Sequence, residues 1–342
     1  MTGRQRVFSI LNGQKPDRMP FFLIYDAEVA AAIAKAHGIN EDEILDYYDS
    51  DMVHIPAALS RTSVDANTRK DIFGVTWRTG IPVPIDHPLS QAERVVDLEN
   101  YPWPDESVLD IAASFDSAQK AHKTGRAVCG GVWASIFTGA RNLLGEEKFL
   151  CGVYENPELI HAVVNRMTDS YIKINTAYFT ACREVCDIFY FGSDFGTQNS
   201  MFLSPEMFDE FFAPYMKQLA NSAKKFDKQV MFHTCGSIVS IIDSLIDCGI
   251  DILNPVQVSA TGMSPKSLAD RFKGRIAFHG GISSQTTFTT GTPDMVYAET
   301  QNTIETLGPF GYIPAPDQEL IGAVTAENID AFVKAVKEYR FK

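Results

Sequence analysis

A histidine and a cysteine stand two positions apart at the end of a short apolar run. The run Val230–Phe232 is typical of a buried strand, and His233 and Cys235 follow it directly. Because side chains two apart on an extended chain point to the same side, both groups can face one ligand. Imidazole nitrogen and thiolate sulfur are ligands that zinc prefers. With a third ligand, the pair predicts a metal site that activates a thiol or a water; without one, it forms the polar rim of another pocket.

The pair belongs to a regular alternation of short apolar runs and amphipathic stretches. The runs predicted to be strands are Pro20–Ile24, Met52–Ile55, Ala127–Cys129, Ile188–Phe191, Val230–Phe232, Ile252–Leu253, Ile276–Phe278 and Tyr312–Ile313. The stretches predicted to be helices are Glu28–His37, Pro157–Cys182, Pro205–Phe226, Ile238–Cys248, Pro265–Phe272, Pro293–Leu307 and Ala326–Tyr339. Strands that alternate with helices pair in parallel through crossover connections. Eight such strands predict an α/β chain folded as a (β/α)8 TIM barrel, a fold of typically ~250 residues.

One long stretch, from about residue 57 to 126, interrupts this alternation. It is rich in proline and too long for a simple connection between a strand and a helix. We therefore predict an insertion after the second strand, lying over or beside the barrel mouth, within a single domain of residues 1–342. A boundary between two domains is the alternative, although no flexible Gly/Ser-rich run marks one.

Composition and charge limit the compartment and the partners. The net charge of -13 argues against nucleic acid as the main partner, because phosphate binding needs a basic face. No run of ~18 apolar residues predicts a membrane span, and no secretory signal is visible at the N-terminus. The six cysteines are scattered, which is not the pattern of a disulfide framework. We therefore expect a cytoplasmic protein without nucleic-acid or membrane partners.

Polar residues follow most of the predicted strands, where the active site of a (β/α)8 barrel forms. In chain order, these candidate ligand contacts include Tyr25, Asp26, Asp194, Gln198, His233, Cys235, Asn254, Gln257, His279, Gly280, Asp317, Gln318 and Glu319. Several have a structural alternative. Asp194 and Asn254 could belong to turns, Gly280 could serve a tight turn, and His279 could hydrogen-bond within the rim. His54, on the second predicted strand, is typical of a core histidine.

A series of motifs extends along nearly the whole chain. In chain order they are Arg4–Gly13, Lys15–Pro20, Asp71–Trp77, Ser193–Gln198, Ser204–Phe208, Phe232–Gly236, Asp251–Gln257 and Phe278–Ile282. In this order they resemble the uroporphyrinogen decarboxylase superfamily, in particular its corrinoid-dependent methyltransferase-like branch. The resemblance implies a (β/α)8 barrel, in agreement with the alternation. The arginine-rich substrate motif of the true decarboxylase is replaced here by Phe21–Asp26, which favours the methyltransferase-like branch.

The resemblance also implies roles for individual residues. The methyltransferases of the branch that this chain resembles hold zinc with a His-x-Cys pair and a later cysteine. His233 and Cys235 match the pair. That third position falls near Pro316–Glu319, which contains neither cysteine nor histidine. Either Glu319 completes the zinc site, or zinc is bound weakly or not at all. Asp194 would orient or protonate the substrate, and other mouth residues such as Gln257 and His279 would line the pocket.

These expectations give one leading hypothesis and two alternatives. The leading hypothesis is a methyltransferase that moves a methyl group between a small-molecule substrate and a corrinoid (a cobalamin-type cofactor) on a separate partner protein, assisted by zinc. The first alternative is a metal-free decarboxylase of a small carboxylic acid, in which Asp194 stabilises a developing cation. The second is a non-catalytic barrel that binds a corrinoid or another ligand. The oligomeric state stays open, with a homodimer as one alternative.

Overall fold

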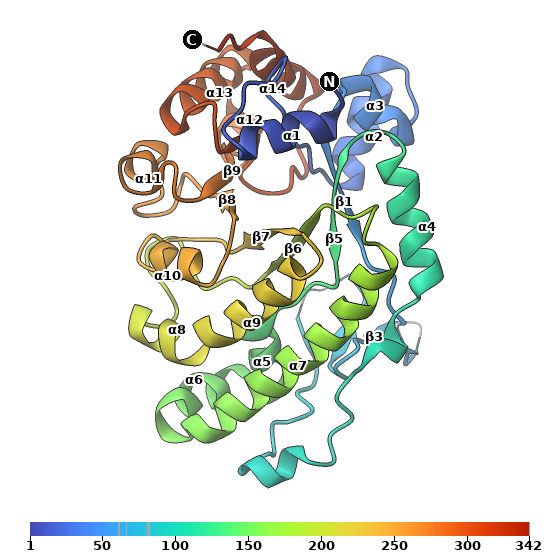
Figure 1. Cartoon of the computed structure of the whole chain (residues 1–342), viewed down its shortest axis with the longest axis vertical. Helices are drawn as coiled ribbons and strands as arrows, with labels where there is room; N and C mark the ends of the chain where they lie inside the picture. Colours follow the sequence, from blue (N-terminus) through green and yellow to red (C-terminus); the bar gives the residue numbers. More distant parts are fainter. Residues whose placement is uncertain (61, 66, 81–82, 342) are drawn as a thin grey trace.

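A curled parallel sheet forms the centre of the molecule (Figure 1). The computed structural model describes residues 1–60, 62–65, 67–80 and 83–341. The sheet has seven strands in the order β1–β5–β6–β7–β8–β9–β10. They are β1 (Met52–Pro56), β5 (Ala127–Gly131), β6 (Ile188–Gly192), β7 (Gln229–His233), β8 (Ile252–Val256), β9 (Ala277–Ile282) and β10 (Tyr312–Pro316). These confirm seven of the eight predicted strands, with ends shifted by a few residues.

The first predicted strand, Pro20–Ile24, is wrong as a regular strand. The segment instead runs between the two edges of the sheet, held by isolated hydrogen bonds. The Phe22 amide donates to the carbonyl of Pro314 in β10 at 3.1 Å, and the Asp51 amide donates to the Phe21 carbonyl at 3.1 Å. Because Pro314 and Pro316 have no N–H to donate, β10 cannot form a full ladder with it. The architecture is compatible with a TIM-like barrel in which this segment takes the place of one strand.

Helices surround the sheet (Figure 1). In the described residues they are α1 (Gly3–Leu11), α2 (Ala27–His37), α3 (Ile44–Tyr48), α4 (Ile111–His122), α5 (Ile136–Leu144), α6 (Glu146–Glu155), α7 (Pro157–Ala181), α8 (Pro205–Phe211), α9 (Ala213–Lys224), α10 (Ile242–Asp247), α11 (Pro265–Phe272), α12 (Thr287–Thr290), α13 (Pro293–Leu307) and α14 (Ala326–Glu338). The predicted helix Pro205–Phe226 is divided at Phe212. The division follows from Pro214, which lacks the N–H needed to continue the hydrogen bonds of α8. No described helix has the length and apolar character needed to span a membrane.

Alternate residues of the strands pack into two separate apolar layers. In β6, Ile188 and Tyr190 belong to a small cluster on the inner face, whereas Phe189 and Phe191 belong to the larger cluster beneath the helices. This division follows from the two-residue period of an extended chain. The inner cluster comprises Val7, Phe22, Met52, Ala127, Cys129, Ile188, Tyr190, Met231, Ile252, Ile313 and Ala315. A residue two positions beyond an inner apolar residue therefore faces the same interior, nearer the C-terminal end of the strand.

The connection from β1 to β5 contains a second, small sheet. Its antiparallel strands are β2 (Thr62–Ser63), β3 (Thr68–Lys70) and β4 (Thr76–Arg78). Further along the same connection, α4 packs against β1 and β5, as a crossover helix does. The predicted insertion of residues 57–126 thus includes this crossover helix. Its location over the barrel mouth stays a prediction.

Candidate functional site

Six polar side chains lie within or just beyond six strands, each two residues after a residue whose side chain faces the interior. They are His54, Tyr190, His233, Asn254, His279 and Asp317. In β7, for example, Met231 belongs to the inner apolar cluster and His233 follows it on the same side. The period of the strands therefore places these groups in one layer above the apolar interior. Four of them, His233, Asn254, His279 and Asp317, were predicted ligand contacts.

The side-chain amide of Asn254 links two of the histidines. Its Oδ1 lies 2.7 Å from His233 Nδ1 and accepts the Tyr190 hydroxyl at 2.8 Å. Its Nδ2 lies 2.7 Å from His279 Nδ1. An amide oxygen only accepts and an amide nitrogen only donates, so His233 carries hydrogen on Nδ1, and His279 carries it on Nε2. His233 Nε2 therefore carries no hydrogen and is an acceptor, available to a metal or a proton.

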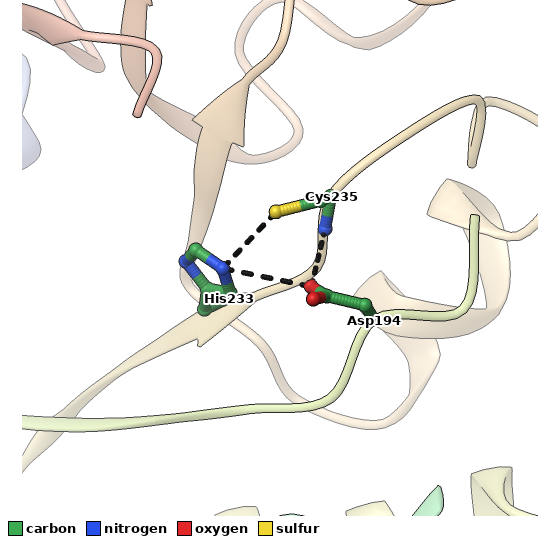
Figure 2. Close-up of side chains that lie close together, drawn as sticks. All are labelled: Asp194, His233 and Cys235. Carbon is green, nitrogen blue, oxygen red and sulfur yellow. Dashed lines mark hydrogen bonds and ion pairs between the residues drawn. The ribbon is translucent and has the colours of Figure 1, made fainter. Parts of the chain in front are cut away.

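His233 Nε2 faces a sulfur and a carboxylate (Figure 2). The Cys235 Sγ lies 3.2 Å away, and the Asp194 Oδ1 lies 3.5 Å away. Asp194 Oδ1 also accepts the backbone N–H of Cys235 at 2.9 Å, which joins the loops that follow β6 and β7. Asp194 is thus more than the cap of a local turn, because it contacts His233 at the end of β7 and Cys235 in the loop that follows.

The loop after Cys235 is fixed by its backbone. Gly236 has φ of +89°, and a Cβ atom there would lie 2.5 Å from the carbonyl carbon of Gly196. Only glycine accommodates both the left-handed conformation and this close approach. The Gly236 N–H donates to Gln257 Oε1 at 2.6 Å. The predicted contact residue Gln257 therefore holds the loop that carries Cys235.

Burial keeps the Cys235 sulfur protonated in the protein alone. Desolvation, reinforced by the negative charge of Asp194, raises the pKa of the thiol to about 12. The S–H can therefore donate to His233 Nε2 at neutral pH. A thiolate at this position requires a nearby positive charge, such as a metal ion would supply.

The donor atoms of Asp194, His233 and Cys235 fit a zinc ion. All three lie within 4.8 Å of one another. Tetrahedral zinc, with bonds of about 2.0–2.3 Å, separates its ligand atoms by roughly 3.3–3.7 Å. The distances from His233 Nε2, 3.2 Å to sulfur and 3.5 Å to oxygen, are close to these values. Nitrogen, sulfur and carboxylate oxygen are all accepted zinc ligands.

The end of β10 brings Gln318 to the sulfur. Gln318 Nε2 donates to Cys235 Sγ at 3.1 Å. The side chain of Glu319 is exposed and is not part of the three-residue group of possible metal ligands found among the described residues. Glu319 as the third ligand stays a prediction, and Asp194 offers a carboxylate that is already next to His233.

A cavity of about 220 Å³ lies beside His233. Its walls are Phe22, Ile24, Tyr190, His233, Asn254, Pro255, His279, Pro316, Asp317, Gln318 and Glu319. These described residues include two carboxylic acids and no lysine or arginine. Burial lowers the pKa of His279 to about 3 and raises the pKa of Asp317 to about 6. His279 is therefore neutral at pH 7.

Four other predicted contacts do not line this cavity. Tyr25 forms an isolated bridge with Leu320 at the edge of the sheet. Asp26 caps α2, since its Oδ1 accepts the N–H of Val29 at 2.8 Å. The other two are Gln198, which joins Gln257 and the Ser259 carbonyl, and Gly280, which has φ of +109° and packs against Val256.

Gln318, which follows the eighth predicted strand, belongs to the site together with two residues that the sequence did not single out, Tyr190 and Trp133. Tyr190 and Gln318 make the contacts described above, and Trp133 packs beside Tyr190 and His233. The Trp133 ring is 38% exposed, with its centroid 5.6 Å from that of His233 and 5.1 Å from that of Tyr190. The period of β6 could have identified Tyr190, which follows Ile188 on the inner face. No sequence signal marks Trp133.

Comparisons with known proteins identify the family. The family model described as "Uroporphyrinogen decarboxylase (URO-D)" matches residues 2–339. A uroporphyrinogen decarboxylase of Danio rerio is 23% identical over 191 residues, which make up 55% of this chain but only 49% of that protein. The solved structure of a methyltransferase from Methanosarcina mazei superposes with a TM-score of 0.74 at 17% identity, covering 99% of both chains, which shows a shared fold. Because the family model covers nearly the whole chain, the protein belongs to the uroporphyrinogen decarboxylase family.

Proposed function

We propose that this protein is a methyltransferase that moves a methyl group between a small molecule and a corrinoid carried by a partner protein. Zinc held by Asp194, His233 and Cys235 would assist the transfer. The observation that carries the proposal is the set of nitrogen, sulfur and oxygen donors, with 3.2 Å and 3.5 Å separations, beside a cavity. Family membership and the fold shared with a methyltransferase support it.

Each residue of the site has a defined part in this function. Asn254 keeps hydrogen on His233 Nδ1, so that Nε2 stays available as a ligand. Asp194 positions Cys235 through its backbone N–H and presents a negatively charged oxygen to the same point. Bound zinc would supply the positive charge that lowers the pKa of a thiol, so that a thiolate exists at neutral pH. The cavity walls hold the small molecule and exclude water from it.

The metal-free decarboxylase receives less support from the site. Binding a carboxylate substrate in a buried cavity needs cationic partners such as arginine. The described residues that line the cavity beside His233 include no arginine or lysine, and both of its histidines are held by Asn254 as hydrogen-bonded side chains. An acidic lining repels a carboxylate instead.

Metal analysis combined with methyl transfer tests the proposal. Purified protein should contain zinc in a one-to-one ratio and should demethylate free methylcobalamin with 2-mercaptoethanol as acceptor, followed by the change in cobalamin absorbance. Cys235→Ser should lose both zinc and turnover. Cys151→Ser, a change at an exposed cysteine outside the site, should lose neither. Wild-type protein that lacks zinc and keeps full turnover after chelation would contradict the zinc role.

A further inference from the structure

Two buried polar atoms of the cavity walls have no hydrogen-bond partner among the residues that the structure describes. They are His279 Nε2 and Asp317 Oδ2. His279 is 1% exposed, and Asp317 is 0% exposed. An unsatisfied buried polar group costs about 1–3 kcal/mol, so such atoms are uncommon in folded proteins. Both residues line the same cavity of about 220 Å³.

The hydrogen bonds around each residue define what its free atom offers. Asn254 Nδ2 donates to His279 Nδ1, so the Nε2 of the neutral ring carries hydrogen and is a donor. Asp317 Oδ1 accepts both the N–H and the hydroxyl of Ser284 at 2.7 Å each. Its Oδ2 is therefore left as an acceptor. The cavity thus presents one donor and one acceptor.

The other walls exclude several ligand classes. Phe22, Ile24, Pro255 and Pro316 give the cavity apolar surfaces. The acids Asp317 and Glu319 repel an anion. The fixed N–H of His279 opposes a ligand that has only donors, because the two hydrogens would face one another. A group with both an acceptor and a donor satisfies both free atoms.

We propose that this cavity binds a compact, uncharged ligand that accepts the N–H of His279 and donates to Asp317, such as a primary carboxamide or an alcohol. That this ligand is the small methyl-transfer substrate rests on the proposed function. The binding itself does not, because it requires neither zinc nor a corrinoid. His279 and Asp317 are the residues that determine its specificity.

Three small probes of nearly the same shape test the hydrogen-bond pattern. Acetamide carries an acceptor and donors, acetate carries only acceptors, and acetamidinium carries only donors. Each is titrated into the metal-chelated full-length protein, labelled with ¹⁵N-histidine and observed by NMR. His279→Gln identifies the Nε2–H resonance of His279 by its loss. Acetamide should bind about tenfold more tightly than either charged probe, as expected from one mispaired hydrogen bond, and should shift this resonance.

Replacing Asp317 with asparagine should reverse the preference. Ser284 donates two hydrogen bonds to Oδ1, so Asp317→Asn would keep its carbonyl there and direct its NH₂ group into the cavity. The cavity would then present two donors, and acetate should become the preferred probe. Glu319→Gln is the matched control, because it removes the same charge from the same cavity without changing the Asp317 hydrogen bonds. It should leave acetamide preferred.

Several outcomes would overturn the proposal. One is that acetate or acetamidinium binds wild-type protein as tightly as acetamide. Another is that a folded Asp317→Asn variant keeps the wild-type order of affinities for the probes. A third is that Glu319→Gln alone makes acetate the preferred probe. If Asp317→Asn does not fold, His279→Phe tests the other atom. Acetamide should then lose about tenfold in affinity, and an unchanged affinity contradicts the proposal. If the protein transfers methyl groups but does not prefer acetamide, the proposed function stands and the binding proposal fails. If it prefers acetamide but does not transfer methyl groups, the binding site stands and the proposed function fails.

Discussion

Gln318 donates the hydrogen of its amide nitrogen to the sulfur of Cys235 over 3.1 Å. A side chain from the end of β10 therefore reaches the position next to the candidate metal ligands. A thiolate at this point would add a second soft ligand, which zinc prefers to an amide. The neighbouring Glu319 is exposed and makes no such contact among the described residues.

Substituting these two neighbours should therefore have different effects. Gln318→Cys should raise zinc affinity by roughly tenfold or more, the scale on which ligand-shell changes act, whereas Glu319→Cys should leave it within about twofold. Competition with a chromophoric chelator measures both. If Glu319→Cys gives the increase and Gln318→Cys does not, Glu319 is the residue that faces the metal.

Asp26 should contribute to stability through α2. Its carboxylate caps the helix by accepting the Val29 N–H. Asp26→Ala should lower the free energy of unfolding by about 1 kcal/mol, and Asp26→Asn should lower it much less, because asparagine also caps. Urea unfolding measures both. A loss of turnover in Asp26→Asn at unchanged stability would instead support the predicted contact with substrate.

The amide of Asn254 should control the tautomer of His279. In Asn254→Asp, a carboxylate oxygen would face His279 Nδ1, where the wild type presents an N–H. The hydrogen of His279 should then move from Nε2 to Nδ1, and the negative charge should raise the pKa of the ring. The ¹⁵N chemical shifts of the two ring nitrogens report both changes. A His279 ring that keeps hydrogen on Nε2 in this variant would contradict the assignment.

His54 should make the protein less stable in acid. Burial, with a smaller effect of His233, lowers its pKa to about 4 in the folded state, compared with 6.5 as the ordinary value. Below pH 6.5 the unfolded chain binds a proton that the folded protein does not, so this contribution is complete above pH 6.5 and is lost as the pH falls toward 4. The loss from this group is at most about 2 kcal/mol at pH 5.

A phenylalanine substitution isolates this effect. His54 packs edge-on against Tyr190 with ring centroids 4.9 Å apart, and His54→Phe keeps an aromatic ring without a titrating group. Urea unfolding at pH 7.5 and pH 5 should show a smaller decrease in stability for the variant than for the wild type. Equal decreases would mean that His54 takes up its proton in the folded protein as readily as in the unfolded chain.

The sequence predicted the strands wherever an apolar run was enough to define them. It failed at Pro20–Ile24, because the regularity of a strand depends on its neighbour, and β10 contains Pro314 and Pro316. The pair of His233 and Cys235 was found because its spacing is local. The small sheet of β2, β3 and β4 was missed, since its strands are short and lack a clear apolar alternation.

The partners of the site residues could not be predicted in the same way. Asp194 meets Cys235 across 41 residues of chain, through the docking of two loops. The choice between Gln318 and Glu319 depends on how the backbone turns after Pro316, and a shift of one residue changes which side chain points inward. The role of Asn254 depends on two histidines from neighbouring strands. Such contacts follow from tertiary structure alone.

Trp133 gives the site an optical property. Its partly exposed ring lies 5.6 Å from the His233 ring, centroid to centroid. The other two tryptophans, Trp77 and Trp103, donate their indole hydrogens to groups elsewhere in the chain. Indole fluorescence responds to charge and contacts beside the ring, so an ion or a ligand that reaches His233 changes the emission of Trp133. The protein thus carries its own fluorophore at the candidate metal centre, and occupancy of that centre can be followed by light without a label.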